Sequence, residues 1–264
     1  MRIARFAGPD GVVGFGVVDG VSPDGAPGPD TTVTPIAGHP FGALEAAGPP
    51  LPFADVRLLA PVLPSKIIAL GKNYAEHAAE MGGEVPAEPM IFLKPSTSVI
   101  GPGDRIDLPP QSAQVEHEAE LAIVIGRLCR EVPVSRVPEV VLGYTVANDV
   151  TARDLQRSDG QWGRAKGFDT FCPLGPWIDT EADPADLAIS CRVNGELRQD
   201  SRTSLLVRGV AELVSWISDV MTLLPGDVIL TGTPAGVGPL VAGDTVSVSI
   251  SSIGTLTNRV VTRD

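Results

Sequence analysis

Two glutamates, two residues apart, stand at the start of an apolar run. Residues 115–126 read V-E-H-E-A-E-L-A-I-V-I-G, and the Ile- and Val-rich second half favours a buried strand over a helix. On a strand, residues two apart share a face, so Glu118 and Glu120 should point the same way. Because neighbouring buried carboxylates repel each other and lose hydration, this pair requires a cation between them or a proton on one of them.

A third carboxylate follows a second predicted strand. Residues 143–156 read G-Y-T-V-A-N-D-V-T-A-R-D-L-Q, which places Asp149 at the tip of that strand. Thr151 and Asp154 have the spacing of a capping box for the helix that follows. Three carboxylates without a convergent Cys or His describe a site for a hard cation, Mg²⁺ or Mn²⁺ before Zn²⁺. The competing interpretation is that these groups are solvated acids at strand edges.

A histidine and a glutamate lie on a short predicted helix. The segment K-N-Y-A-E-H-A-A-E-M follows a buried strand over residues 66–70, and Asn73 with Glu76 again resembles a capping box. His77 and Glu80 are three residues apart and therefore share a helix face. A carboxylate can fix the imidazole tautomer and raise its basicity, so the pair could act as a general base. The alternative is a solvated pair on the surface.

Further polar residues could complete a site around the carboxylates. Arg153 and Gln156 lie four and seven positions after Asp149 and share its face if the helix continues. Lys166 follows in the predicted loop R-A-K-G-F-D. A lysine beside three carboxylates would be held charged and could stabilise an enolate or a substrate carboxylate, whereas alone it would be an ordinary surface lysine. Lys94, after a predicted strand over residues 90–93, is either functional or merely exposed.

A glycine-rich loop follows a strand near the C-terminal end. The run V-I-L-T-G-T-P-A-G-V-G is not a phosphate-binding loop of the Walker type, because no G-K-[ST] follows and no helix begins. The glycines instead allow the backbone to approach a small ligand, with Thr231 or Thr233 as a hydroxyl contact.

Composition narrows the class of protein. The 264 residues are 43% hydrophobic and carry a formal charge of −12, which argues against nucleic acid and anionic membrane surfaces as partners. Cys129, Cys172 and Cys191 are widely spaced and form no C-x-x-C pair, which indicates buried thiols in a reducing compartment. Without an apolar stretch that could be a signal peptide or a membrane span, we expect a cytoplasmic protein.

The pattern along the chain predicts many short strands. We expect a hairpin over residues 3–6 and 12–18, a Pro- and Gly-rich surface excursion over residues 21–50 with a helical turn at 41–47, and a domain boundary near Pro61. Asn194-Gly195 predicts a second hairpin, residues 207–221 a packing helix and residues 245–250 a strand.

Five of these segments, in this order, resemble the fumarylacetoacetate hydrolase family: K-N-Y-A-E-H-A-A-E-M, H-E-A-E-L, N-D-V-T-A-R-D-L-Q, the Lys166 loop and T-G-T-P-A-G-V-G. The resemblance covers residues 61–264, and residues 1–60 are similar to the small extra domain of bacterial members. It implies an α+β, β-rich fold in which a mixed β-roll catalytic domain over 61–264 follows a small N-terminal β domain over 1–60. It also implies a homodimer.

The resemblance implies a role for each candidate residue. Glu118, Glu120 and Asp149 match the ligands of a metal, usually Mg²⁺, with Mn²⁺ as the alternative, and Lys166 would add a second positive charge at an enolate.

On the substrate side, Gln156 and Thr233 match positions that hold the substrate carboxylate, with Arg153 beside them. His77 and Glu80 match a lid helix that closes on the substrate and activates water.

The implied activity is that of an enzyme acting on small 2-oxo or 2-enol carboxylates through a metal-stabilised enolate. C–C bond hydrolysis of an acylpyruvate or decarboxylation of oxaloacetate leads this interpretation. The alternative is a 2-hydroxyhepta-2,4-diene-1,7-dioate isomerase or 5-oxopent-3-ene-1,2,5-tricarboxylate decarboxylase of aromatic catabolism. A different class, a non-catalytic protein that binds a small acid through a metal, also stays open.

Overall fold

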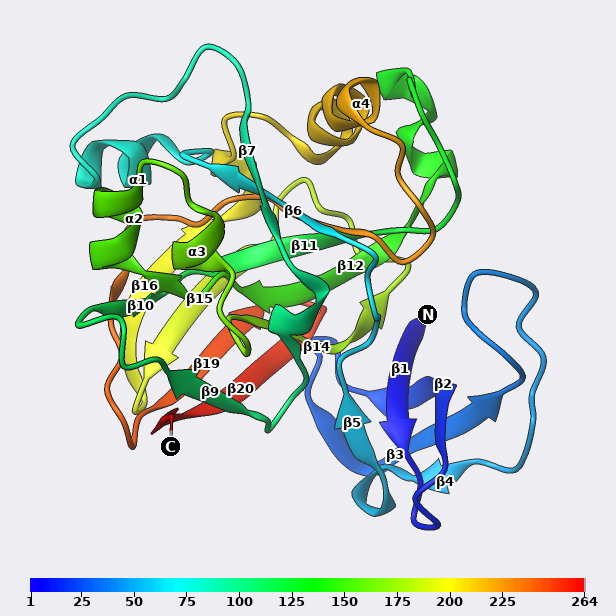
Figure 1. Cartoon of the computed structure of the whole chain (residues 1–264). Coiled ribbons are helices and arrows are strands. Elements are labelled where there is room, and N and C mark those ends of the chain that lie inside the picture. Colours follow the sequence, from blue (N-terminus) through cyan, green and yellow to red (C-terminus); the bar gives the residue numbers. More distant parts are fainter. Residues whose placement is uncertain (264) are drawn as a thin grey trace.

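The N-terminal part of the chain is a small antiparallel sheet. The computed structural model describes residues 1–263, and the first strands are β1 (Arg2–Ala7), β2 (Val13–Val21), β3 (Pro27–Ile36), β4 (Leu51–Pro52) and β5 (Arg57–Leu59) (Figure 1). The β1–β2 pairing, from Arg2 opposite Val18 to Ala7 opposite Val13, confirms the predicted hairpin.

The predicted helical turn at residues 41–47 is wrong. That segment is irregular, and Ala46 forms an isolated bridge to Ile36 instead. The surface excursion predicted for residues 21–50 also contains a ten-residue strand, β3, in which Thr31, Val33 and Ile36 are buried. Pro, Gly and Asp at the start of this strand obscured the alternation that its second half shows.

A 12-stranded sheet runs through the molecule, in the order β4-β3-β2-β1-β14-β12-β11-β17-β6-β7 with β5 on β1 and β8 on β14. Its further strands are β6 (Ile67–Gly71), β7 (Met90–Lys94), β8 (Val99–Ile100), β11 (Ala119–Ile125), β12 (Val141–Asn148), β14 (Cys172–Asp179) and β17 (Val228–Leu230). Because β1 pairs with β14, the N-terminal strands extend the same sheet. Every residue of β11 is buried, as its apolar run predicts.

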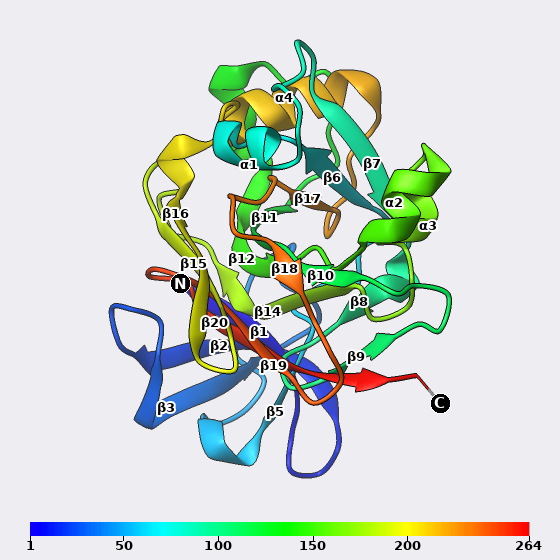
Figure 2. The same cartoon turned by 90° about the vertical axis from the view of Figure 1, so that its left-hand side faces the viewer.

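A five-stranded sheet packs against this one through a large apolar core. Its order is β16 (Glu196–Arg202), β15 (Ala188–Val193), β19 (Thr245–Ile250), β20 (Gly254–Thr262) and β9 (Arg105–Leu108). Figure 2 shows β20 beside β9 and, near them, β10 (Val115–His117) and β18 (Gly238–Pro239), which form a small sheet with β13 (Thr151–Ala152). The predicted hairpin at Asn194-Gly195 and the strand at 245–250 are confirmed.

Few helices cover the sheets. The predicted packing helix is α4 (Val210–Val220). It begins after the cap residue Gly209, later than predicted, and buries Leu213, Val214 and Ile217. The short helices α1 (Ala75–Glu80), α2 (Arg153–Asp159) and α3 (Gly163–Lys166) lie together at the other end of the sheet (Figure 1). Turns of 3₁₀ helix occupy Phe53–Asp55, Ser96–Ser98, Val134–Glu139 and Thr203–Leu205. Among the described residues, no helix is long and apolar enough to cross a membrane.

Neither predicted capping box forms. The cap residues of α1 and α2 are Tyr74 and Ala152, and neither makes a side-chain cap. Asn73 instead donates to the carbonyl of Thr231 at 2.8 Å, and Thr151 donates to the carbonyl of Asp149 at 2.8 Å. Asp154 accepts from the Ser112 hydroxyl and the Ala113 amide. These polar side chains connect segments distant in sequence, which local spacing cannot reveal.

The three cysteines are free and buried, as their spacing predicted.

Candidate active site

The three predicted carboxylates converge at the ends of two neighbouring strands. One oxygen from each of Glu118, Glu120 and Asp149 lies within 4.8 Å of the others, and all three residues are buried. Asp149 directly follows β12, where the pairing of Ala119 with Asn148 brings it beside Glu118. The Asp149 amide also donates to the Glu118 carbonyl at 2.8 Å. The alternative of solvated strand-edge acids is therefore excluded.

The strand predicted over residues 115–126 is interrupted at Glu118. β10 ends at His117 and β11 begins at Ala119, and the two strands belong to different sheets. At the break, the Glu118 amide donates to the Asn148 side chain at 2.9 Å. The chain thus passes from one sheet to another at Glu118, which carries one of the three carboxylates.

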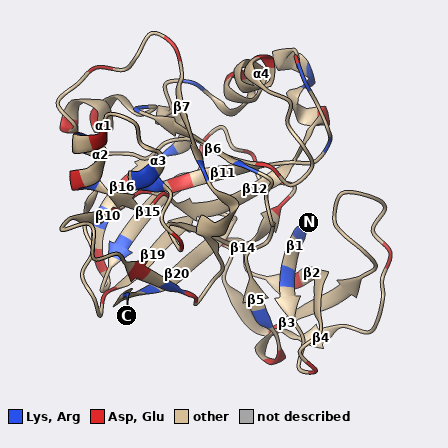
Figure 3. Ribbon diagram, viewed as in Figure 1, with Lys and Arg blue, Asp and Glu red and all other residues tan. Residues whose placement is uncertain are grey.

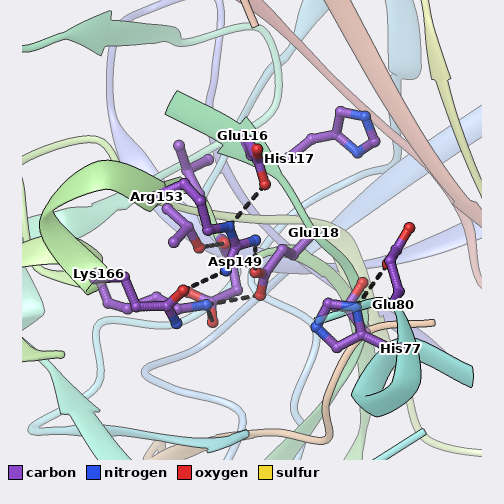
Figure 4. Close-up of polar contacts among 12 residues, drawn as sticks. His77, Glu80, Glu116, His117, Glu118, Asp149, Arg153 and Lys166 are labelled. Carbon is purple, nitrogen blue, oxygen red and sulfur yellow. Dashed lines mark hydrogen bonds and ion pairs between the residues drawn. The ribbon is translucent and has the colours of Figure 1, made fainter. Parts of the chain in front are cut away.

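Two lysines pair with Glu118 and Asp149, and Figure 4 shows the contacts of one of them, Lys166. Lys166 Nζ donates to Glu118 Oε2 at 2.7 Å and to Asp149 Oδ2 at 2.6 Å. Lys166 is the last residue of α3, so its assignment to a loop was wrong. Lys94 is 1% exposed and its Nζ donates to Asp149 Oδ1 at 2.5 Å, which removes the interpretation of Lys94 as merely exposed.

The Arg153 guanidinium orients a carboxylate of the triad. Its Nε donates to Glu116 Oε2 at 2.7 Å, one terminal nitrogen donates to Glu118 Oε1 at 2.5 Å, and the other donates to Gln156 Oε1. Arg153 and Gln156 therefore do lie together as predicted. Because its nitrogens are engaged with protein groups, Arg153 is placed to hold Glu118 rather than to bind substrate alone.

The triad carboxylates experience opposite electrostatic environments. Burial raises the pKa of Glu118, but the charges of Lys166 and Arg153 outweigh burial and hold that pKa well below its usual range. Burial, followed by the charges of Asp149 and Glu118, raises the pKa of Glu120 well above its usual range. Glu120 Oε2 accepts from the Gly232 amide at 2.7 Å. Its buried Oε1 has no hydrogen-bond partner within residues 1–263.

The formal charges of the cluster do not balance. Four carboxylates and three cationic groups meet here: Glu116, Glu118, Glu120, Asp149, Lys94, Arg153 and Lys166. Figure 3 shows the basic end of α3 beside the acidic start of β11. The excess of one negative charge, the all-oxygen donor set and the unpartnered Oε1 of Glu120 together fit a hard divalent cation such as Mg²⁺ or Mn²⁺.

The predicted histidine–glutamate pair forms on α1. His77 Nδ1 lies 3.1 Å from Glu80 Oε2 (Figure 4), and Glu80 Oε1 accepts from the Gly236 amide at 2.9 Å. His77 is 5% exposed, so the pair is not a solvated surface pair. If Nδ1 carries the proton that the carboxylate accepts, Nε2 is left as the basic nitrogen.

One cavity collects most of the predicted residues. It has a volume of about 180 Å³, and its walls include His77, Glu118, Arg153, Gln156, Lys166 and Thr233. Thr231 faces the protein interior, where its hydroxyl donates to the Leu121 carbonyl at 3.0 Å. Of the two threonines proposed as ligand contacts, only Thr233 reaches the cavity.

Comparison with known proteins identifies the family. A family model described as fumarylacetoacetate (FAA) hydrolase C-terminal matches residues 66–261, and one described as Rv2993c-like, N-terminal, matches residues 1–61. The chain belongs to the fumarylacetoacetate hydrolase family. The resemblance drawn from the five sequence segments and the predicted β-rich α+β fold are thereby confirmed.

Similar proteins carry several activities. A structure of 5-carboxymethyl-2-hydroxymuconate delta-isomerase from Mycobacterium smegmatis is 57% identical, covers all of both chains and has a TM-score of 0.91. The mitochondrial oxaloacetate tautomerase Fahd2a of Rattus norvegicus is 48% identical over 83% of this chain and 74% of its own. A structure of fumarylpyruvate hydrolase from Pseudomonas aeruginosa in complex with Mn²⁺ and pyruvate is 35% identical over 78% of this chain and 92% of its own, with a TM-score of 0.73.

The sequence analysis missed Gln199, which lies on β16. Its Oε1 accepts from the Ala119 amide and faces His117 Nδ1, each at 3.0 Å. Its Nε2 donates to Thr233 Oγ1 and to the Pro234 carbonyl, each at 2.8 Å. Gln199 thus connects the strand break of the triad to the loop that carries Thr233.

Glu116 was also missed as a member of the cluster, whereas the sequence leaves Lys94 as either functional or merely exposed. Lys94 stands at the end of a predicted strand, and strand ends are where site residues collect, so that signal was available for Lys94. No local signal marks Gln199, because its partners lie about 80 and 34 residues away in the sequence.

Proposed function

We propose that this protein is a metal-dependent enzyme that moves a proton between carbon and oxygen in a small 2-oxo carboxylate, a keto–enol tautomerase or isomerase. The observation that carries the proposal is the cavity whose wall His77 shares with Lys166 and with Glu118 of the carboxylate triad. The names of the rat and M. smegmatis relatives support proton transfer, which we therefore rank ahead of hydrolysis and decarboxylation. A volume of about 180 Å³ favours a small acid.

Glu118, Glu120 and Asp149 would hold Mg²⁺ or Mn²⁺. A cation bound there supplies positive charge that lowers the energy of an enolate. The Mn²⁺ in the fumarylpyruvate hydrolase structure supports this assignment. Lys94 and Arg153 hold two of the three carboxylates in place, so the ligands are positioned before any substrate enters.

The substrate-facing donors follow from the hydrogen bonds already made. Thr233 Oγ1 accepts a bond from Gln199, which leaves its own hydroxyl hydrogen to donate into the cavity. The side-chain oxygen of Gln156 accepts from Arg153, which leaves its NH₂ group as a donor. Lys166 uses two bonds for carboxylates and has a third to offer. These groups would orient a substrate carboxylate and an enolate oxygen.

His77 would carry the proton. Its Nε2 would take a proton from the carbon next to the 2-oxo group, and the electron pair of the broken C–H bond would form the enolate. The imidazolium would then return the proton to the enolate oxygen, and the reverse order would convert enol to ketone. Glu80 fixes the tautomer of His77 and is itself held by the Gly236 amide.

The test uses oxaloacetate, whose enol and keto forms differ in ultraviolet absorbance. We expect Mg²⁺-loaded protein to accelerate the interconversion, EDTA to abolish that acceleration, and added Mg²⁺ or Mn²⁺ to restore it. His77→Asn should remove most of the acceleration, whereas His39→Asn, at an exposed histidine, should not. A rate that is indifferent to EDTA and to His77→Asn would contradict the proposal.

A second candidate is C–C hydrolysis of an acylpyruvate, because the same His77–Glu80 pair could activate a water molecule. The fumarylpyruvate hydrolase relative supports it. Pyruvate released from acetylpyruvate or fumarylpyruvate would favour this reaction, and pyruvate from oxaloacetate would favour decarboxylation. Turnover of a homoprotocatechuate-pathway dienoate without release of pyruvate would favour the isomerase. Binding without turnover of any of these acids would favour the non-catalytic alternative.

A further inference from the structure

Two cations line the active-site cavity without an acidic partner. Lys72 and Arg157 contribute to its walls, yet neither forms an ion pair within residues 1–263. The other two cationic residues of the wall, Arg153 and Lys166, are both paired with Glu118. The chain has 32 Asp and Glu residues against 20 Lys and Arg residues. Because acidic side chains are in excess, two unpaired cations that line one small cavity indicate that they bind an anion from outside the protein.

Lys72 reaches the cavity through an unusual backbone conformation. It follows Gly71, the last residue of β6, and has a φ of +57°. This left-handed conformation is costly for a residue other than Gly, Asn or Asp, and such residues gather at functional sites. Its Nζ lies against Gly83, where an added Cβ would come within 2.5 Å. The ammonium group of the half-buried Lys72 therefore lies beside the segment that follows α1.

Arg157 lies on α2, on the helix face that also carries Arg153. It follows Arg153 by four positions, so the two share a helix face and are offset by about 6 Å, slightly more than one turn, along the helix axis. One of its terminal nitrogens donates to Gln114 Oε1 at 2.5 Å, a neutral acceptor that fixes the side chain without neutralising it. The cationic residues of the cavity wall thus extend about one helical turn beyond Arg153.

We infer that Lys72 and Arg157 form a second anion subsite, which binds the distal carboxylate of a dicarboxylic 2-oxo acid. The first carboxylate and the 2-oxo group lie at the triad end, an arrangement that rests on the proposed function. A four- or five-carbon chain is comparable in length to the offset of about 6 Å along α2 between Arg153, which holds Glu118, and Arg157. A monocarboxylic 2-oxo acid would place an apolar group against the two cations and would bind more weakly.

The test compares ligands that differ only in the distal carboxylate and cannot be turned over. L-Malate and 2-hydroxybutyrate have the same chain length, and the second carries a methyl group where malate has its second carboxylate. Isothermal titration calorimetry in the presence of Mg²⁺ gives both affinities. We expect wild-type protein to prefer malate by at least about tenfold, the effect of one charge-assisted hydrogen bond. Lys72→Gln and Arg157→Gln should each reduce that preference, and the double variant should reduce it to about one.

Arg164→Gln is the matched control, because Arg164 lies on the adjacent α3 but pairs with Asp159 outside the cavity. It should retain the wild-type preference. Equal affinities of wild-type protein for the two acids, or a preference that survives in the double variant, would overturn the subsite. The wild-type comparison depends on no substitution, so misfolding of a variant cannot hide the result.

A parallel turnover comparison separates this inference from the proposed function. Oxaloacetate and 2-oxobutyrate also differ only in the distal carboxylate. If malate is preferred and the double variant loses the preference, the subsite stands, and absence of proton exchange in both 2-oxo acids would then count against the proposed function alone. If both acids exchange protons at equal kcat/KM and malate is not preferred, the proposed function stands and the subsite fails.

Discussion

The two ends of the active-site cavity are held in different ways. At the triad end, Glu118 and Asp149 are buried and are fixed by Lys94, Arg153 and Lys166. At the other end, the short helix α1 places His77 through Glu80, whose one bond to another segment runs to the Gly236 amide.

The two ends therefore have different roles. The triad end holds its charged groups in place before a ligand binds, whereas the helix end has fewer attachments and is suited to move as substrate enters. Substitutions at the triad end should therefore affect metal binding and stability together. Substitutions at the helix end should affect turnover alone.

The largest effect is expected at Glu118. Glu118→Ala removes a proposed metal ligand and leaves the buried Arg153 and Lys166 without one of their partners. We expect loss of metal binding and a fall in the free energy of unfolding of about 3–5 kcal/mol. Chemical denaturation and metal titration by calorimetry measure the two. Wild-type stability in this variant would show that the triad end is not held as described.

His77→Ala should separate chemistry from metal binding. Removal of the proposed general base should lower kcat by about 10²–10⁴-fold, while the affinity for Mg²⁺ should stay at the wild-type value because His77 makes no bond to the triad. Steady-state kinetics and calorimetry on the same preparation test this. A parallel loss of metal affinity would contradict the division between the two ends.

Gln199 connects the strand break of the triad to the loop that carries Thr233, so its substitution should affect both stability and substrate binding. Gln199→Ala leaves the buried Ala119 amide and Pro234 carbonyl without their partner, which should cost about 1–3 kcal/mol of stability. We expect KM to rise because Thr233 is no longer held. Gln199→Glu is the matched variant, since it keeps the acceptor for Ala119 but cannot donate to Thr233 or Pro234. If the rise in KM follows from Thr233, Gln199→Glu should share it.

The smallest effect is expected at Glu80. In Glu80→Gln the amide oxygen can still accept from Gly236 or from His77, but the carboxylate that bonds to both is gone. We expect kcat to fall by about tenfold, with no change in metal affinity or thermal stability. Steady-state kinetics measure the change, and a wild-type kcat would remove Glu80 from the proposed proton transfer.

The sequence predicted which residues converge at the site better than it predicted their local backbone geometry. Period-two and apolar patterns located β11, β12 and β19, because burial imposes these patterns directly on the residues. The spacing of Glu118 and Glu120 and the strand-end position of Asp149 were enough to predict convergence of the triad.

Long-range contacts explain what the sequence did not predict. The capping boxes failed because Asn73 and Asp154 bond to distant backbone groups, and Gln199 was missed because its role exists only once β16 packs beside β11. The two-domain division at residue 60, the homodimer and the cytoplasmic location remain predictions.

Cation binding by the triad is tested most directly at Glu120. This residue has no cationic partner, so Glu120→Gln leaves no buried charge unpaired and should fold normally. We predict that calorimetric titration detects one Mn²⁺ site in wild-type protein and in His77→Ala, with equal affinity, and that Glu120→Gln weakens that site by at least tenfold. Equal Mn²⁺ affinity in wild-type protein and Glu120→Gln would contradict the account.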